Sequence, residues 1–143
     1  MSETTFLRSD ELPGATALGY LASDGLRTNV LHLPVRGSGD GGIYTTAADV
    51  RAFWEALLAG RIVAREWVAE MTRPRSASPD GRRYGLGFWL HGSTDTVMLE
   101  GYDAGVSFLS LHDPAAGLTA TVVGTTAEAA WPLARLLQER LVD

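Results

Sequence analysis

The sequence predicts an α+β fold in which helices pack against an antiparallel sheet. One amphipathic helix lies in the first half of the chain, short apolar segments separated by turn signals fill the second half, and a helix closes the chain. The 143 residues are 45% hydrophobic and 20% charged, which suffices for one domain with a buried core. We therefore expect a single domain over residues 1–143.

The most clearly patterned helix begins after Thr46. Thr46 and Asp49 resemble a capping box, although Glu or Gln is the usual residue at the third position. Gly60 is placed to end this helix, and a shorter helix is predicted over 64–71. Apolar residues recur along one stripe of the first helix: Val50, Phe53, Trp54, Leu57 and Leu58.

Strands are predicted over 84–90, 97–99, 104–111 and 118–123. The turn at 113–117, Asp-Pro-Ala-Ala-Gly, is short, which favours antiparallel pairing of the last two strands. An earlier hairpin is predicted over 15–34, around the turn signal Ser-Asp-Gly. The closing helix has Pro132 in its first turn and leucines 133, 136, 137 and 141 on one face.

Composition excludes several classes of function. The net charge of -5 does not supply the basic face that nucleic-acid binding requires. The chain has no cysteine, so disulfides, thiolate catalysis and cysteine zinc sites are excluded, and its 12 basic residues are all arginine, so no lysine amine is available for chemistry. No apolar run is long enough to span a membrane, and the N-terminus lacks the pattern of a signal peptide, which leaves the cellular location open.

Two patterns that often mark ligand sites lack the context that would support them. Gly37, Gly39 and Gly42 match G-x-G-x-x-G, but four residues separate the last glycine from the helix, and a plain loop is the favoured interpretation. Histidines 32, 91 and 112 do not have the spacing of a metal site, so we expect no metal and no cofactor.

Side chains that could act directly are few. Ser107 lies in the middle of a predicted strand and outside any G-x-S-x-G elbow, so a structural role is favoured over a nucleophilic one. Glu100 and Asp103 flank Gly101 and Tyr102 in an apolar neighbourhood. Solvated acids at a turn are the favoured interpretation, and a paired-carboxylate hydrolase is the alternative.

Taken in order, several segments resemble the serine β-lactamase and penicillin-binding-protein superfamily, especially class C β-lactamase-like esterases and D-alanyl-D-alanine peptidases. Residues 39–50, GDGGIYTTAADV, are similar to the stretch AGGLYSTAxDLARF of that branch. Residues 84–89, YGLGFW, resemble its YGLGWW strand, and 104–108 with Asp-Pro at 113–114 resemble its PGFSS…DPexG hairpin. The resemblance implies a partial β-lactamase/transpeptidase-like fold.

The resemblance also implies where a site would lie. The S-x-x-K and Y-x-N motifs of the family precede the matched region and are not in this chain, so no catalytic residue is expected here. The slot of the family's K-T-G or H-T-G motif holds Leu99, Glu100 and Gly101. The next residue, Tyr102, occupies the position whose backbone N–H contributes to the oxyanion hole. Glu100, Gly101 and Tyr102 are therefore the expected substrate-binding wall.

These observations lead to two hypotheses for function. The first is the C-terminal portion of a serine hydrolase that transfers acyl groups from a β-lactam, a D-alanyl peptide or a small ester, and that is inactive alone. The alternative is a non-catalytic binding or assembly module derived from that fold. The carboxylate of Glu100 is expected to repel carboxylate-bearing substrates. A missing N-terminal segment or a homo-oligomer is expected to cover the exposed sheet.

Overall fold

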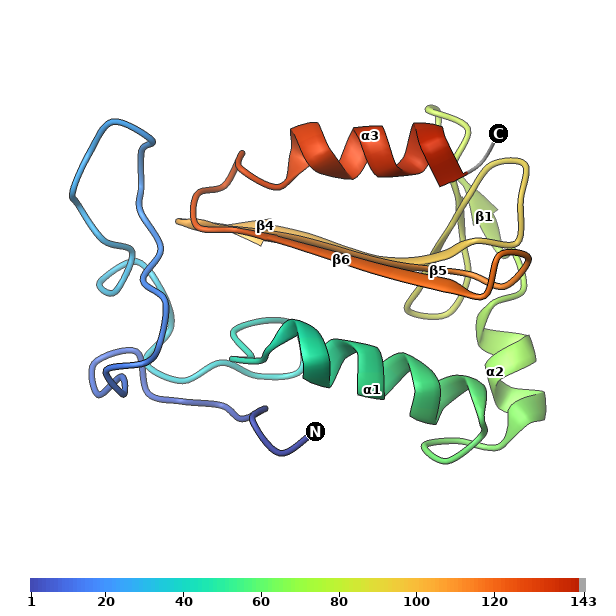
Figure 1. Cartoon of the computed structure of the whole chain (residues 1–143), viewed down its shortest axis with the longest axis horizontal. Coiled ribbons are helices and arrows are strands. Elements are labelled where there is room, and N and C mark those ends of the chain that lie inside the picture. Colours follow the sequence, from blue (N-terminus) through green and yellow to red (C-terminus); the bar gives the residue numbers. More distant parts are fainter. Residues whose placement is uncertain (142–143) are drawn as a thin grey trace.

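The computed structural model describes residues 1–141 as three layers, with a helix on each face of a sheet (Figure 1). Helix α1 (Ala47–Leu58) covers one face and helix α3 (Trp131–Leu141) covers the other, while α2 (Arg65–Met71) links α1 to the first strands. Within residues 1–141 no helix has the length and apolar character needed to cross a membrane. The predicted α+β class is confirmed.

The sheet has six strands in the order in which they occur along the chain, and every neighbouring pair is antiparallel. Its body is formed by β4 (Val97–Asp103), β5 (Val106–Asp113) and β6 (Leu118–Gly124), which pair over seven residues at each junction. Three two-residue strands extend it on the β4 side: β1 (Ser76–Ala77), β2 (Arg83–Tyr84) and β3 (Trp89–Leu90).

The prediction of one strand over 84–90 was wrong. The chain reverses between β2 and β3, where Gly87 adopts a left-handed φ of 87° and the N–H of Gly85 donates to the carbonyl of Phe88. Glycine tolerates this conformation because it has no Cβ. The glycine spacing of this segment therefore produces a tight hairpin, which places Tyr84 opposite Trp89.

Alternation along β5 divides the core between the two faces of the sheet. On the α3 side, Leu109 and Leu111 are 1% exposed and pack with Ala134. On the α1 side, Trp54 donates from Nε1 to Ser110 Oγ at 2.8 Å and stacks against the ring of His112. The predicted stripe of α1 thus contacts the sheet. The face predicted for α3 was wrong in part, because Leu137 packs against the sheet whereas Leu133 and Leu136 are 49% and 46% exposed.

The partial capping box before α1 differs from the standard motif in the hydrogen bonds that the side chain of Asp49 makes. Thr46 Oγ1 accepts the N–H of Asp49 at 3.2 Å, as predicted for an N-cap. The carboxylate of Asp49 accepts the backbone N–H of Glu3 and the hydroxyl of Thr4 instead. The shorter Asp side chain thereby attaches the N-terminal segment to the helix.

The predicted hairpin over 15–34 is reduced to one bridge, between Tyr20 and Thr28. The N-terminal segment, blue in Figure 1, lies across one end of the sheet. Tyr20 donates its N–H to the carbonyl of Thr125, and Asn29 donates from Nδ2 to the carbonyl of Ala104 at 2.9 Å. These contacts with the sheet satisfy polar groups that a longer hairpin would have paired internally.

Candidate functional site

The expected wall residues all lie on the part of β4 that has an open edge. β5 pairs with β4 along its whole length, whereas β3 pairs only with Val97 and Met98. Among the described residues 1–141, no strand pairs with Glu100, Gly101 or Tyr102 on the side away from β5.

The register gives the direction of the backbone groups along this edge. The N–H of His91 donates to the carbonyl of Thr96 on the β3 side. Because backbone groups alternate in direction along an antiparallel strand, those of Met98, Glu100 and Tyr102 also point away from β5. The N–H of Tyr102 is therefore directed at the open edge.

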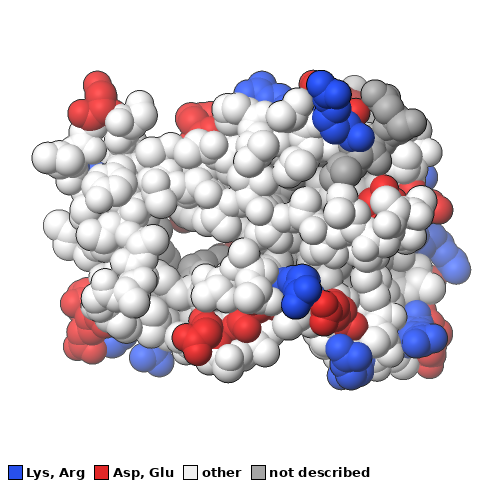
Figure 2. All heavy atoms as spheres, viewed as in Figure 1, with Lys and Arg blue, Asp and Glu red and all other residues white. Residues whose placement is uncertain are grey.

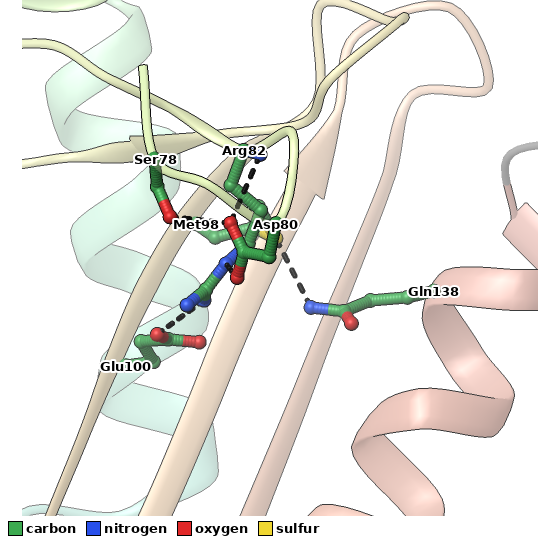
Figure 3. A network of polar contacts seen from close by, with 6 residues as sticks. All are labelled: Ser78, Asp80, Arg82, Met98, Glu100 and Gln138. Carbon is green, nitrogen blue, oxygen red and sulfur yellow. Dashed lines mark hydrogen bonds and ion pairs between the residues drawn. The ribbon is translucent and has the colours of Figure 1, made fainter. Parts of the chain in front are cut away.

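The carboxylate of Glu100 is bound by an arginine rather than free. Glu100 accepts a hydrogen bond from Nη1 of Arg82, and its side chain is 19% exposed. The guanidinium lies 4.4 Å from the ring centre of Trp89, and its Nε lies 2.8 Å from Asp80. Figure 3 shows Arg82 between the two carboxylates, with Met98 and Gln138 beside them.

The electrostatics of this cluster favour the charged forms. Burial opposes the charge of Arg82, but hydrogen bonds to Glu100 and Asp80 outweigh it and raise the pKa of the guanidinium. A hydrogen bond from Ser78, followed by hydrogen bonds from Arg82, lowers the pKa of Asp80 to about 2. Because the single guanidinium of Arg82 is shared by two carboxylates, the cluster keeps a net negative charge, and the repulsion of acidic substrates stays a prediction.

Tyr102 and Gly101 leave the edge accessible on both faces of the strand. The Tyr102 side chain is 74% exposed and meets Trp131 edge-to-face, with ring centres 6.3 Å apart. A Cβ placed on Gly101 would meet no atom within 4 Å. Leu99, in the slot of the family's cationic or imidazole residue, packs against the core on the α1 side.

The other candidate residues do not form a second site. Ser107 is fully buried, donates to the carbonyl of Thr126 at 2.7 Å and accepts the N–H of Ala130 at 3.0 Å. Glu100 and Asp103 are three residues apart on one strand and so project to opposite faces, which separates the proposed carboxylate pair. Within residues 1–141, no three histidine or acidic side chains are grouped as a metal site would require.

A groove of about 530 Å³ lies away from the wall residues, beside α2 and the start of β4. Val68, Leu90 and Val97 form part of its lining, with Arg83 and His112. None of the expected wall residues lines this groove. Sequence reasoning also missed Arg82, which the fold brings to Glu100 and stacks over the ring of Trp89.

Two solved structures have a fold similar to that of this chain. The penicillin-binding protein of Bacillus halodurans superposes with a TM-score of 0.86 at 30% identity, over 96% of this chain and 44% of that one. A D-stereospecific amidohydrolase from Streptomyces sp. shares the fold, with a TM-score of 0.74 at 21% identity, over 96% of this chain and 43% of that one. No curated protein matches.

This chain thus spans less than half the length of the solved structures that it resembles. A sequence model of the family described as Beta-lactamase matches residues 1–141. The resemblance inferred from the motifs is confirmed over almost the whole chain, which belongs to the Beta-lactamase family.

Proposed function

We propose that this chain is one part of a β-lactamase-related serine hydrolase, and that the open edge of β4 forms one wall of its acyl-transfer site. The observation that carries the proposal is the direction of the Tyr102 N–H, which faces an edge that no described strand covers. A backbone donor at such an edge can bind the carbonyl oxygen of a substrate and the oxyanion that develops from it.

The nucleophile and its base would come from polypeptide outside these 143 residues. The chain contains no S-x-x-K motif, and Ser107 is buried with both of its hydrogen bonds directed at backbone groups. The substrate class remains a β-lactam, a D-alanyl peptide or a small ester. Arg82 is shared between Glu100 and Asp80, which leaves a net negative charge beside this wall and favours substrates without a nearby carboxylate.

The second candidate function is a non-catalytic binding module. Leu99 favours it, because a core leucine stands where the family's motif has a cationic or imidazole side chain. In this case the edge of β4 would hold no acyl ligand.

Two measurements separate these functions. Intact mass spectrometry after exposure to a fluorescent penicillin and a fluorophosphonate is expected to show no adduct on the chain alone. An adduct on any serine would contradict the assignment of the nucleophile to another segment. Titration of the ¹⁵N-labelled chain with penicillin G is then expected to shift the amide of Tyr102 and to leave that of Thr119, at the opposite edge of the sheet, unchanged.

Two variants of one position test the backbone donor itself. Tyr102→Ala keeps the N–H and is expected to keep the ligand-induced shifts along β4. Tyr102→Pro removes the N–H while sparing the bonds to β5, and it is expected to abolish those shifts. Absence of any shift at β4 in the unmodified chain would favour the binding module.

A further inference from the structure

The half of β4 that carries the candidate wall is paired with β5 only, and no described strand lies on its other side. The last pair of the β4–β5 hairpin joins Asp103 to Val106. Only Ala104 and Gly105 connect the two strands. The end of a strand with one partner is easily displaced, because few backbone hydrogen bonds hold it in place. A contact that fixes this turn therefore also fixes the position of the Tyr102 N–H.

Asn29 of the N-terminal segment makes such a contact. Its Nδ2 donates to the carbonyl of Ala104 at 2.9 Å, and its side chain occupies the space that a Cβ on Gly105 would need. Asn29 is 6% exposed, so the protein shields this hydrogen bond from water, which strengthens it. Because Ala104 lies two residues after Tyr102, the bond fixes the chain directly beside the candidate donor.

The backbone around Asn29 is itself attached to the sheet. The N–H of Asn29 donates to the carbonyl of Gly19 at 2.9 Å. Gly19 packs so closely on the turn that a Cβ there would overlap the carbonyl oxygen of Gly105. The next residue, Tyr20, donates its N–H to the carbonyl of Thr125, just after β6. Asn29 therefore acts from a support that is bound at two points, and its side chain has a fixed direction.

The residues of this contact are all uncharged: Gly19, Asn29, Ala104 and Gly105. The N-terminal segment lies at the left of Figure 1. Figure 2, from the same direction, shows that the middle of this end of the molecule is almost free of charged side chains, which lie toward its upper and lower margins. A neutral exchange at Asn29 thus changes the support of the turn without changing the charge at the wall.

We propose that Asn29 is a positioning residue for the wall. Through the carbonyl of Ala104 it holds the end of β4, so that the N–H of Tyr102 keeps its direction toward a substrate carbonyl. A donor in an oxyanion site stabilises charge best when it is fixed before the reaction, and its supporting residues must hold it within about 0.5 Å. This role rests on the proposed function, since the donor matters only if the edge of β4 binds a carbonyl oxygen.

Titration of the ¹⁵N-labelled chain with penicillin G, followed at the Tyr102 amide, tests this role. Asn29→Ala removes the side-chain donor and is expected to raise the Kd about three- to tenfold. Thr96→Val is the matched control at the other end of β4. Thr96 is 2% exposed, and its hydroxyl accepts a hydrogen bond from Thr94 Oγ1 at 3.0 Å. This control is expected to lose stability in urea unfolding to a similar extent and to keep the Kd of the unmodified chain.

Relaxation of the ¹⁵N nuclei in the free chain provides a readout that needs no ligand. The order parameter of the Tyr102 amide is expected to fall from about 0.85 toward 0.6 in Asn29→Ala and to stay unchanged in Thr96→Val. Asn29→Asp is the second variant if Asn29→Ala does not fold. It keeps the size of the side chain but replaces the donor by an acceptor, and the same changes at Tyr102 are expected.

The outcomes separate this role from the proposed function. A penicillin-induced shift at Tyr102 in the unmodified chain, with the same Kd and order parameter in a folded Asn29 variant, overturns the role of Asn29 and leaves the wall standing. An equal rise of the Kd in Thr96→Val also overturns it, because the effect would then follow stability alone. If the unmodified chain shows no shift at Tyr102, the wall is refuted, and the role of Asn29 in it is refuted as well.

Discussion

Replacing Gly105 by alanine tests how the N-terminal segment holds the turn next to the candidate site. Gly105 joins β4 to β5 and has a left-handed φ of 74°. A Cβ at this position would lie 2.7 Å from the Cβ of Asn29, closer than real side-chain contacts allow. Asn29 is only 6% exposed, so it has little room to move away.

Gly105→Ala should lower the free energy of unfolding for two reasons: the left-handed backbone and the contact with Asn29. A second turn of the same sheet isolates the backbone effect. Gly117 also has a left-handed φ, of 63°, but a Cβ there would meet nothing within 4 Å. Gly117→Ala should therefore lower the free energy of unfolding only by the left-handed penalty, about 1–2 kcal/mol. Gly105→Ala should also displace Asn29 from the carbonyl of Ala104, which costs about 1–3 kcal/mol more.

Urea unfolding of the two variants measures this difference. With a slope of about 2 kcal/mol/M, typical of a small domain, the midpoint of Gly105→Ala should lie about 0.5–1.5 M below that of Gly117→Ala. The slopes should be equal if only the native state is affected. Equal midpoints would refute the argument, because they would show that Asn29 does not confine the turn.

Two further predictions concern buried polar groups. Ser107→Ala leaves the N–H of fully buried Ala130 without an acceptor, so the free energy of unfolding should fall by about 1–3 kcal/mol in urea unfolding. A change within about 0.5 kcal/mol, as at surface positions, would contradict the structural role of this serine. Burial lowers the pKa of His112 below its ordinary value of 6.5, against a smaller opposing effect from the charge of Asp113. Because the unfolded chain then binds the proton more readily, protonation of His112 favours unfolding. The free energy of unfolding should therefore keep its full value above pH 6.5 and decrease as the pH drops below it. A midpoint at or above 6.5 in an NMR titration of His112 would contradict this.

Several elements were determined by local sequence. The stripe that includes Val50 and Trp54 produced α1, and Thr46 capped it as predicted. The short turn at 113–117 produced the antiparallel pair of β5 and β6. These features depend on contacts between residues close in sequence, which a periodic pattern records directly.

The structure corrected the predictions at two places, one where distant segments compete for the same groups and one at a local turn. The hairpin predicted over 15–34 gave way to contacts between Asn29 and the turn at Gly105. The strand over 84–90 divided because Tyr84 and Trp89 face each other across a tight turn. Local propensity cannot anticipate the first result, because the stabilising partner lies elsewhere in the chain. The second has a local cause, the left-handed φ of Gly87.

The candidate site, too, was predicted in part from local sequence and decided in part by the tertiary structure. The motif around residues 99–102 predicts the wall, and the absence of S-x-x-K and lysine predicts that the nucleophile lies outside this chain. The tertiary structure alone decided that Arg82 pairs with Glu100 and that the N–H of Tyr102 points to an open edge. Both properties depend on how the strands are arranged in the sheet, which brings together Arg82 and Glu100, 18 positions apart, and leaves no periodic trace in the sequence.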